Sequence, residues 1–219
     1  MVDYKFSADW FSVHIPQFER YVAPLNGTPC RLLEIGVDEG RATTWLADNV
    51  LSHPASALDC IDLTICDNLR NNVDVSTRRS QITLHEGLSR DVLKTLEPAS
   101  YDFIYVDGSH STVDVLEDAV LSFRLAKIGA TIAFDDYLWD DEPWNGYGAP
   151  KQALDAFMSI YADSPRYEPL LKRLTADSND QIWVTKLAES RNCYVEHSSD
   201  RAPPSRRAAR QWWSRFRQR

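Results

Sequence analysis

Five short apolar runs, each followed by a segment with helical spacing, restrict most strongly the folds open to this chain. The runs are RLLEIG, SALDCIDL, SQITLHEG, YDFIYVDG and ATIAFDDY, at residues 31–36, 56–63, 80–87, 101–108 and 130–137. Apolar runs of this length are typical of strands covered on both faces, as in a parallel sheet with helical crossovers. The sequence therefore predicts an α/β fold with a Rossmann-like, doubly wound sheet.

The rest of the chain extends this prediction. Residues 166–175 and 180–187 have strand character and lie few residues apart, which permits an antiparallel hairpin at one sheet edge. We therefore expect a mostly parallel sheet of seven strands. The helix after Ser111 is expected to begin at a capping box with Asp114 and to stop at Gly129.

Charge divides the chain into two parts. Residues 191–219 hold eight arginines against one Glu and one Asp, a net charge of +6, within a chain whose total is −8. Residues 1–190 therefore carry −14 and are expected to form one domain, followed by a basic tail that is mobile or amphipathic. An acidic domain is a poor match for a phosphate backbone, so nucleic acid is not an expected partner.

The tail and the cysteines bear on partners and location. The stretch SRRAARQWWSRFRQR could lie on an anionic membrane, bind a partner or RNA, dock on an acidic neighbouring subunit, or be disordered. Docking on protein is the hypothesis that suits the acidic domain, so we expect a homo-oligomer or a tail-mediated protein contact. No apolar run of about 18 residues and no signal-like N-terminus are present, and the four cysteines form no C-x-x-C pair. We therefore expect a cytoplasmic protein with reduced thiols and no transmembrane segment.

A glycine turn follows the first apolar run. In EIGVDEGR, Glu34 is followed by Gly36 and Gly40. In an open parallel sheet the ligand lies beyond the carboxyl ends of the strands, where glycines let the backbone approach it. Asp38 and Glu39 in the same turn would repel a pyrophosphate, which disfavours a dinucleotide site.

An acid at the end of the second run points to a nucleoside. Asp62 occupies this place, and a carboxylate there can accept both hydroxyls of a ribose. The glycine turn together with this acid resembles the class I S-adenosylmethionine-dependent methyltransferases. Four segments within residues 9–187 resemble one branch of these enzymes, called methyltransferase domain 24. They are DWFSVHIPQFERYVAPL, LLEIGVDEGRATTWLADNVLSHP, YDFIYVDGSHSTVDVLEDAVLSFRLAKIGATIAFDDYLW and KQALDAF.

The resemblance implies a place for the methyl donor. S-adenosylmethionine would lie over the glycine turn, with Asp62 on its ribose and side chains near Gly87 and Ser89 close to its adenine. The residues that this resemblance assigns to the cofactor are Glu34, Gly36, Gly40, Asp62, Gly87, Ser89 and Asp107.

The fourth and fifth runs end in acids and a histidine. Three carboxylates, from Asp107, Asp135 and Asp136, would meet at the carboxyl edge and raise one another's pKa unless a cation lay between them. Oxygen ligands of this kind suit Mg²⁺. By similarity to catechol and sugar O-methyltransferases, these three residues are assigned as metal ligands. Asp107 and His110 are assigned as catalytic, with His110 as the general base.

The predicted function is therefore S-adenosylmethionine-dependent O-methylation of a small hydroxylated acceptor, a sugar or a phenol, assisted by a divalent cation. Two alternatives are a non-catalytic scaffold with this fold and a nicotinamide-dependent dehydrogenase. The aromatic loop at residues 137–150 is either a lid or a packed surface loop. His14 and Trp10 are candidates to line the site, although core packing is the stronger expectation for Trp10.

Overall fold

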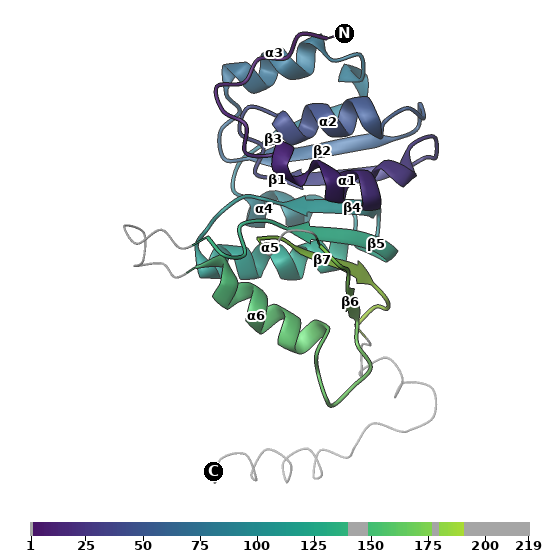
Figure 1. Cartoon of the computed structure of the whole chain (residues 1–219), viewed down its shortest axis with the longest axis vertical. Coiled ribbons are helices and arrows are strands. Elements are labelled where there is room, and N and C mark those ends of the chain that lie inside the picture. The colour runs from purple at the N-terminus through teal and green to yellow at the C-terminus, as the bar shows by residue number, and fades with distance from the viewer. Residues whose placement is uncertain (1, 140–148, 177–179, 191–219) are drawn as a thin grey trace, which may run out of the picture. The chain divides into compact units, whose positions relative to one another are not determined.

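The fold was analysed in a computed structural model that describes residues 2–139, 149–176 and 180–190. Its centre is a seven-stranded sheet in the order β3-β2-β1-β4-β5-β7-β6 (Figure 1). The strands are β1 Arg31–Ile35, β2 Ala57–Asp62, β3 Ile82–Glu86, β4 Tyr101–Val106, β5 Ala126–Phe134, β6 Leu171–Arg173 and β7 Ile182–Lys186. The first five strands run parallel, and β7 pairs antiparallel with both β5 and β6. The predicted doubly wound sheet with a C-terminal hairpin is confirmed.

Helices cover both faces of the sheet. They are α1 Ile15–Tyr21, α2 Arg41–Asn49, α3 Asp67–Val75, α4 Ser89–Val92, α5 Thr112–Leu125 and α6 Pro150–Tyr161, with 3₁₀ turns at Ser12–His14, Ala23–Leu25, Arg79–Gln81 and Leu93–Thr95. Along β4, Phe103 and Tyr105 pack with α1, α2 and α3, whereas Ile104 and Val106 pack with α5 and α6. Strands that are buried on both sides explain the apolar runs in the sequence. No helix among the described residues is long and apolar enough to cross a membrane.

Residues 2–189 belong to one compact unit. The arginine-rich tail at 191–219 lies outside the described residues, so the boundary at residue 190 stays a prediction.

The predicted start of α5 at Ser111 is confirmed, but the predicted stop at Gly129 was wrong. Ser111 is the N-cap residue, but its side chain makes no capping bond, and Asp114 accepts from the Ser109 hydroxyl at 3.0 Å, so the expected capping box is absent. At the other end the helix stops at Leu125, and Gly129 lies inside β5. The predicted strand at 166–175 is shortened to β6, three residues long.

A buried lysine explains where α5 ends. Lys186 of β7 is fully buried, and its Nζ donates to the carbonyl oxygens of Phe123 and Ala126 at 2.8 Å each. The last carbonyls of a helix need donors from outside the helix, and an ammonium group supplies them while also matching the helix dipole. The Glu189 carboxylate, 2.6 Å from Nζ, balances the charge.

Gly36 allows β1 and β4 to converge at the carboxyl edge. Its φ is 80°, and a Cβ built there would lie 1.9 Å from the carbonyl oxygen of Asp107. The neighbouring hydrogen bond from the Asp107 amide to the Ile35 carbonyl, 2.7 Å long, holds the two strand ends together. Any side chain at position 36 would therefore separate them.

Glu34 is buried directly behind this turn. Its side chain is 1% exposed, and its Oε2 accepts from the Thr43 hydroxyl of α2 at 2.6 Å. Burial raises the pKa of this carboxyl to about 8, because a desolvated carboxylate is unfavourable. One bond from Thr43 only partly offsets that effect.

We predict that Gly36→Ala destabilises the fold far more than Gly129→Ala. Gly129 has a φ of 88° but nothing within 4 Å of a built Cβ, so alanine there adds backbone strain alone, about 1 kcal/mol. At Gly36 the clash with backbone adds at least about 2 kcal/mol more. Urea unfolding of both variants measures the difference, and equal losses would contradict the close approach of the strands.

We also predict that Glu34→Gln flattens the pH dependence of stability. The raised pKa means that between pH 4.5 and about 8 the folded chain holds a proton that the unfolded chain releases. The free energy of unfolding should therefore fall as pH rises through this window, by up to about 1.4 kcal/mol per unit. Urea unfolding from pH 5 to 8 should show the free energy of unfolding falling more steeply with pH in wild type than in Glu34→Gln. Equal pH dependence in the two proteins would contradict this interpretation of Glu34.

Candidate functional site

The carboxyl ends of the strands open into a cleft of about 1250 Å³. The ends of all five parallel strands contribute to its wall, as does the N-terminal segment. The predicted site residues that line it are Glu34, Gly36, Asp62, Gly87, Ser89, Asp107, His110, Asp135 and Asp136. Gly40 is the remaining predicted residue; it is buried at the N-cap of α2 with a φ of 82° and does not line the cleft.

Asp62 supports the glycine turn. Its Oδ2 accepts from the backbone amides of Val37 at 2.8 Å and Asp38 at 3.1 Å, while its Oδ1 accepts from Thr64 at 3.1 Å. These bonds fix the turn beside β2 and account for the acid at the strand end. The side chain still lines the cleft, where its remaining lone pairs can accept from a ligand hydroxyl.

Gly87 and Ser89 form the adjoining wall after β3. The Gly87 amide donates to the Asp62 carbonyl at 2.9 Å, so this turn continues the hydrogen bonding between the parallel strands. Ser89 begins α4 and hydrogen-bonds to Asp118 of α5. Asp118 is almost fully buried, and burial raises the pKa of its carboxyl to about 6.

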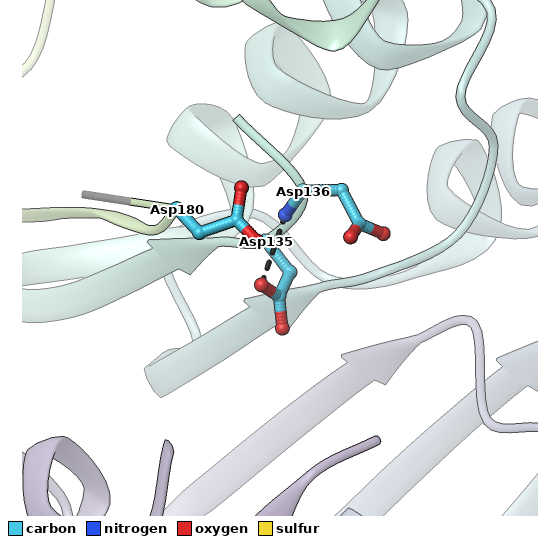
Figure 2. Close-up of side chains that lie close together, drawn as sticks. All are labelled: Asp135, Asp136 and Asp180. Atoms are coloured by element: carbon cyan, nitrogen blue, oxygen red, sulfur yellow. Dashed lines mark hydrogen bonds between the residues drawn. The ribbon is translucent and has the colours of Figure 1, made fainter. Parts of the chain in front are cut away.

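Three carboxylates gather where β5 ends. Oxygen atoms of Asp135, Asp136 and Asp180 lie within 4.8 Å of one another (Figure 2). Asp135 and Asp136 follow β5, and Asp180 approaches from the segment that leads into β7. Asp136 has a φ of 56°, an uncommon conformation that Asp tolerates, and its amide donates to Asp135 Oδ1 at 2.9 Å.

Asp180 was missed in the sequence-based prediction. Its carbonyl accepts from the Tyr137 amide at 2.8 Å and its Oδ1 from the Leu138 amide at 2.9 Å, so it closes the turn after β5. The available signal was its position just before an antiparallel strand. Because β7 starts where β5 ends, with Phe134 paired to Ile182, the residue before β7 must lie at the carboxyl edge.

Asp107 lies beside this cluster but is not one of its members. The Tyr105 hydroxyl donates a short bond to Asp135 Oδ2, and its oxygen also lies 3.1 Å from Asp107 Oδ2. Burial raises the pKa of Asp107 well above its usual value, and the charges of Asp135 and Asp136 raise it further. Burial also raises the pKa of Asp135. Ionising the acids at this edge is therefore less favourable than in water, unless a nearby positive charge offsets the burial.

His110 contacts the cluster from the loop after β4. Its Nε2 lies 2.8 Å from Asp136 Oδ2, and its ring packs at 4.1 Å from that of Trp139. A carboxylate only accepts, so Nε2 carries the hydrogen in this pair and Nδ1 is the acceptor in the neutral ring. Asp136 thus sets the tautomer that leaves one ring nitrogen free to accept a proton.

The N-terminal segment supplies another wall of the cleft. Trp10 is 78% exposed, so the expectation of core packing was wrong, and it lines the cleft together with His14. Arg41 holds this segment through Asp9 at 3.3 Å and the Ser12 hydroxyl at 2.7 Å. These bonds keep the exposed indole beside the site. Most of the aromatic loop, residues 140–148, lies outside the described residues.

Comparison with known proteins agrees with this arrangement. Residues 33–137 match the family described as "Methyltransferase domain", methyltransferase domain 24. An uncharacterized protein, R132, of Acanthamoeba polyphaga mimivirus is 26% identical over 168 residues, which span 73% of this chain and 72% of that protein.

Two solved structures share the fold at low identity. The O-methyltransferase TomG from Streptomyces achromogenes, solved with SAM, is 20% identical with a TM-score of 0.57 over 72% of this chain and 73% of TomG. The MycE methyltransferase of the mycinamycin pathway, solved with Mg, SAH and mycinamycin VI, is 15% identical with a TM-score of 0.60. That match covers 84% of this chain and 50% of MycE.

The matched segment runs from the strand before the glycine turn to the residue after Asp136, and so contains most of the cleft. Over residues 33–137, just under half of the chain, the sequence is therefore that of a methyltransferase domain of the methyltransferase domain 24 branch, within the class I S-adenosylmethionine-dependent methyltransferases.

Proposed function

We propose that this protein transfers a methyl group from S-adenosylmethionine to a hydroxyl oxygen of a small acceptor, a sugar or a phenol, with a divalent cation at the acceptor end of the cleft. The observation that carries the proposal is the cluster of Asp135, Asp136 and Asp180, with His110 bound to it. The cluster shares one cleft with the glycine turn, so a donor site and an acceptor site adjoin.

The residues around the glycine turn fit the methyl donor. The close approach of backbone at Gly36 leaves the turn free of side chains on that side, and Asp62 offers acceptor oxygens for ribose hydroxyls. Asp107 would face the cationic end of the donor, where its charge is favourable. The donor supplies a methyl group on a sulfonium, and the protein must hold an acceptor oxygen in line with it, about 3 Å away.

The acid cluster fits a hard divalent cation. All three side chains offer carboxylate oxygens, they are partly exposed, and their ligand atoms already lie within 4.8 Å of one another. Mg²⁺ prefers such ligands, so these three carboxylates would hold it, and it would supply positive charge near the acceptor hydroxyl. MycE, which was solved with Mg, supports the same proposal. The proposed ligands differ from those predicted from the sequence in one residue, because Asp180 replaces Asp107. A bound cation would lower the pKa of an acceptor hydroxyl.

His110 is proposed as the general base. With Nε2 directed at Asp136, its Nδ1 can take the hydroxyl proton as the oxygen attacks. The exposed ring of Trp10 and the ring of Trp139 beside His110 offer flat apolar surfaces for a sugar face or a phenol.

The two alternatives receive less support. Glu39 of the glycine turn accepts from the Ser7 amide and hydroxyl, and Asp38 lies beside it, so the turn carries acids where a dehydrogenase binds pyrophosphate. A scaffold would have no need for a histidine and three carboxylates in one cleft. Binding measurements separate both alternatives from methyl transfer.

We predict two separate binding events in calorimetric titrations. S-adenosylhomocysteine should bind in EDTA, and Mg²⁺ should then give its own heat. Asp180→Asn should weaken Mg²⁺ binding at least about tenfold and leave S-adenosylhomocysteine unchanged, because it removes a ligand charge from the cluster alone. Asp163→Asn, at an exposed acid paired with Arg173, is the matched control and should match wild type.

Other outcomes of these titrations distinguish the alternatives. Binding of the donor without any Mg²⁺ heat would remove the cation from the mechanism. Binding of NAD in place of S-adenosylhomocysteine would favour the dehydrogenase, and binding of neither would favour the scaffold.

We predict that His110→Ala lowers kcat for methyl transfer by about 10²–10⁴ and leaves S-adenosylhomocysteine affinity unchanged. Initial rates with radiolabelled donor and a panel of catechols and sugars measure the effect. His53→Ala is the control, since His53 lies in the turn before β2 and accepts from the Ala55 amide. Unchanged turnover in His110→Ala would mean that another group takes the proton.

A further inference from the structure

One oxygen of Asp135 is occupied by two side-chain donors. Its Oδ2 accepts a short bond from the Tyr105 hydroxyl and a bond of 2.9 Å from Gln181 Nε2. Its Oδ1 accepts from the Asp136 amide at 2.9 Å and faces His14 Nε2 at 3.6 Å. The carboxylate is thereby fixed in one rotation, with Oδ2 toward the core and Oδ1 on the side of Asp136.

The two donors are themselves held in place. Gln181 is 4% exposed, and its Oε1 accepts from the buried indole Nε1 of Trp183 at 2.9 Å. Since an indole N–H can only donate, it keeps the amide oxygen on its own side and directs the amide nitrogen at Asp135. A flipped amide would set an oxygen against the carboxylate.

Tyr105 is held by aromatic packing. The ring of Phe18 from α1 lies edge-on to Tyr105 at 5.1 Å and to Trp183 at 5.2 Å. Tyr105 is 1% exposed, so its hydroxyl has little freedom to leave the two acids that it contacts. The same ring system thus fixes both donors to Asp135.

Tyr105 also connects the two ends of the cleft. Its hydroxyl contacts Asp107, proposed above for the donor side, and Asp135, proposed above for the cation. A carboxylate that must rotate before it can bind a cation loses affinity, and partners that orient metal ligands are worth about 10–100-fold in metal affinity.

We infer that Tyr105 and Gln181 are positioning residues for the cation, which hold Asp135 by its Oδ2 and leave its Oδ1 for the ligand cluster. This inference rests on the cation site of the proposed function. It goes beyond that proposal because neither residue belongs to the acid cluster or to the site residues predicted from the sequence.

The test is a calorimetric titration of Mg²⁺ into wild type, Tyr105→Phe and Tyr101→Phe. Tyr101 is the matched control: it lies on the same strand, is fully buried, and its hydroxyl donates to a different acid, Asp59, at 2.8 Å. We expect the Mg²⁺ Kd to rise about tenfold in Tyr105→Phe and less than about twofold in Tyr101→Phe. In urea with EDTA, both variants should lose a similar free energy of unfolding. If Tyr105 were merely structural, its variant would show this loss of stability without a change in the Mg²⁺ Kd.

Asp136→Asn and Gln181→Leu separate the remaining outcomes. If Asp136→Asn loses Mg²⁺ binding while Tyr105→Phe binds like wild type, the positioning role is overturned and the cation site stands. If wild type gives no Mg²⁺ heat, the cation site fails and this inference fails with it. If Tyr105→Phe does not fold, Gln181→Leu decides, since a Kd equal to that of wild type would overturn the role of the donors to Oδ2.

Discussion

The contact between the ends of β1 and β4 is the constraint on which the cleft depends. The carbonyl of Asp107 occupies the space that a side chain at residue 36 would need, so Gly36 is required by steric exclusion. This contact sets Asp107 next to the glycine turn, and the pairing of β4 with β5 then carries Asp135 to the same edge. The glycine turn and the acid cluster are therefore positioned by the pairing of three adjacent strands, β1, β4 and β5.

Hydrogen-bonded acids serve the structure at this edge as well as the proposed chemistry. The Asp62 carboxylate fixes the glycine turn through two backbone amides, and the Asp180 carboxylate fixes the turn after β5 through the Leu138 amide. Each carboxylate keeps lone pairs that can accept from a ligand. An acid that is held by backbone donors is already oriented before a ligand arrives, which lowers the entropy lost on binding.

The parallel part of the sheet could be predicted from the sequence, together with the acids that it positions. Glu34, Asp62, Asp107 and Asp135 could be assigned to one edge because each lies at the end of an apolar run. Asp180 was missed, because its place becomes clear only once the antiparallel strand β7 is paired with the end of β5. Tyr105 shows the same limit, since an apolar run gives no sign of which polar group a buried hydroxyl will meet.

The length of α5 illustrates a dependence on distant residues. A glycine is a common helix stop, yet the helix ends before Gly129 because Lys186, some 60 residues along the chain, binds its last carbonyls. The family match at 33–137 excludes this lysine, and it excludes β7, which covers the edge of β5. The stretch that matches the family is thus shorter than the stretch that completes the sheet and the end of α5. A ribosome must release residues up to about 189 before the helix end, the sheet edge and the acid cluster can all be completed.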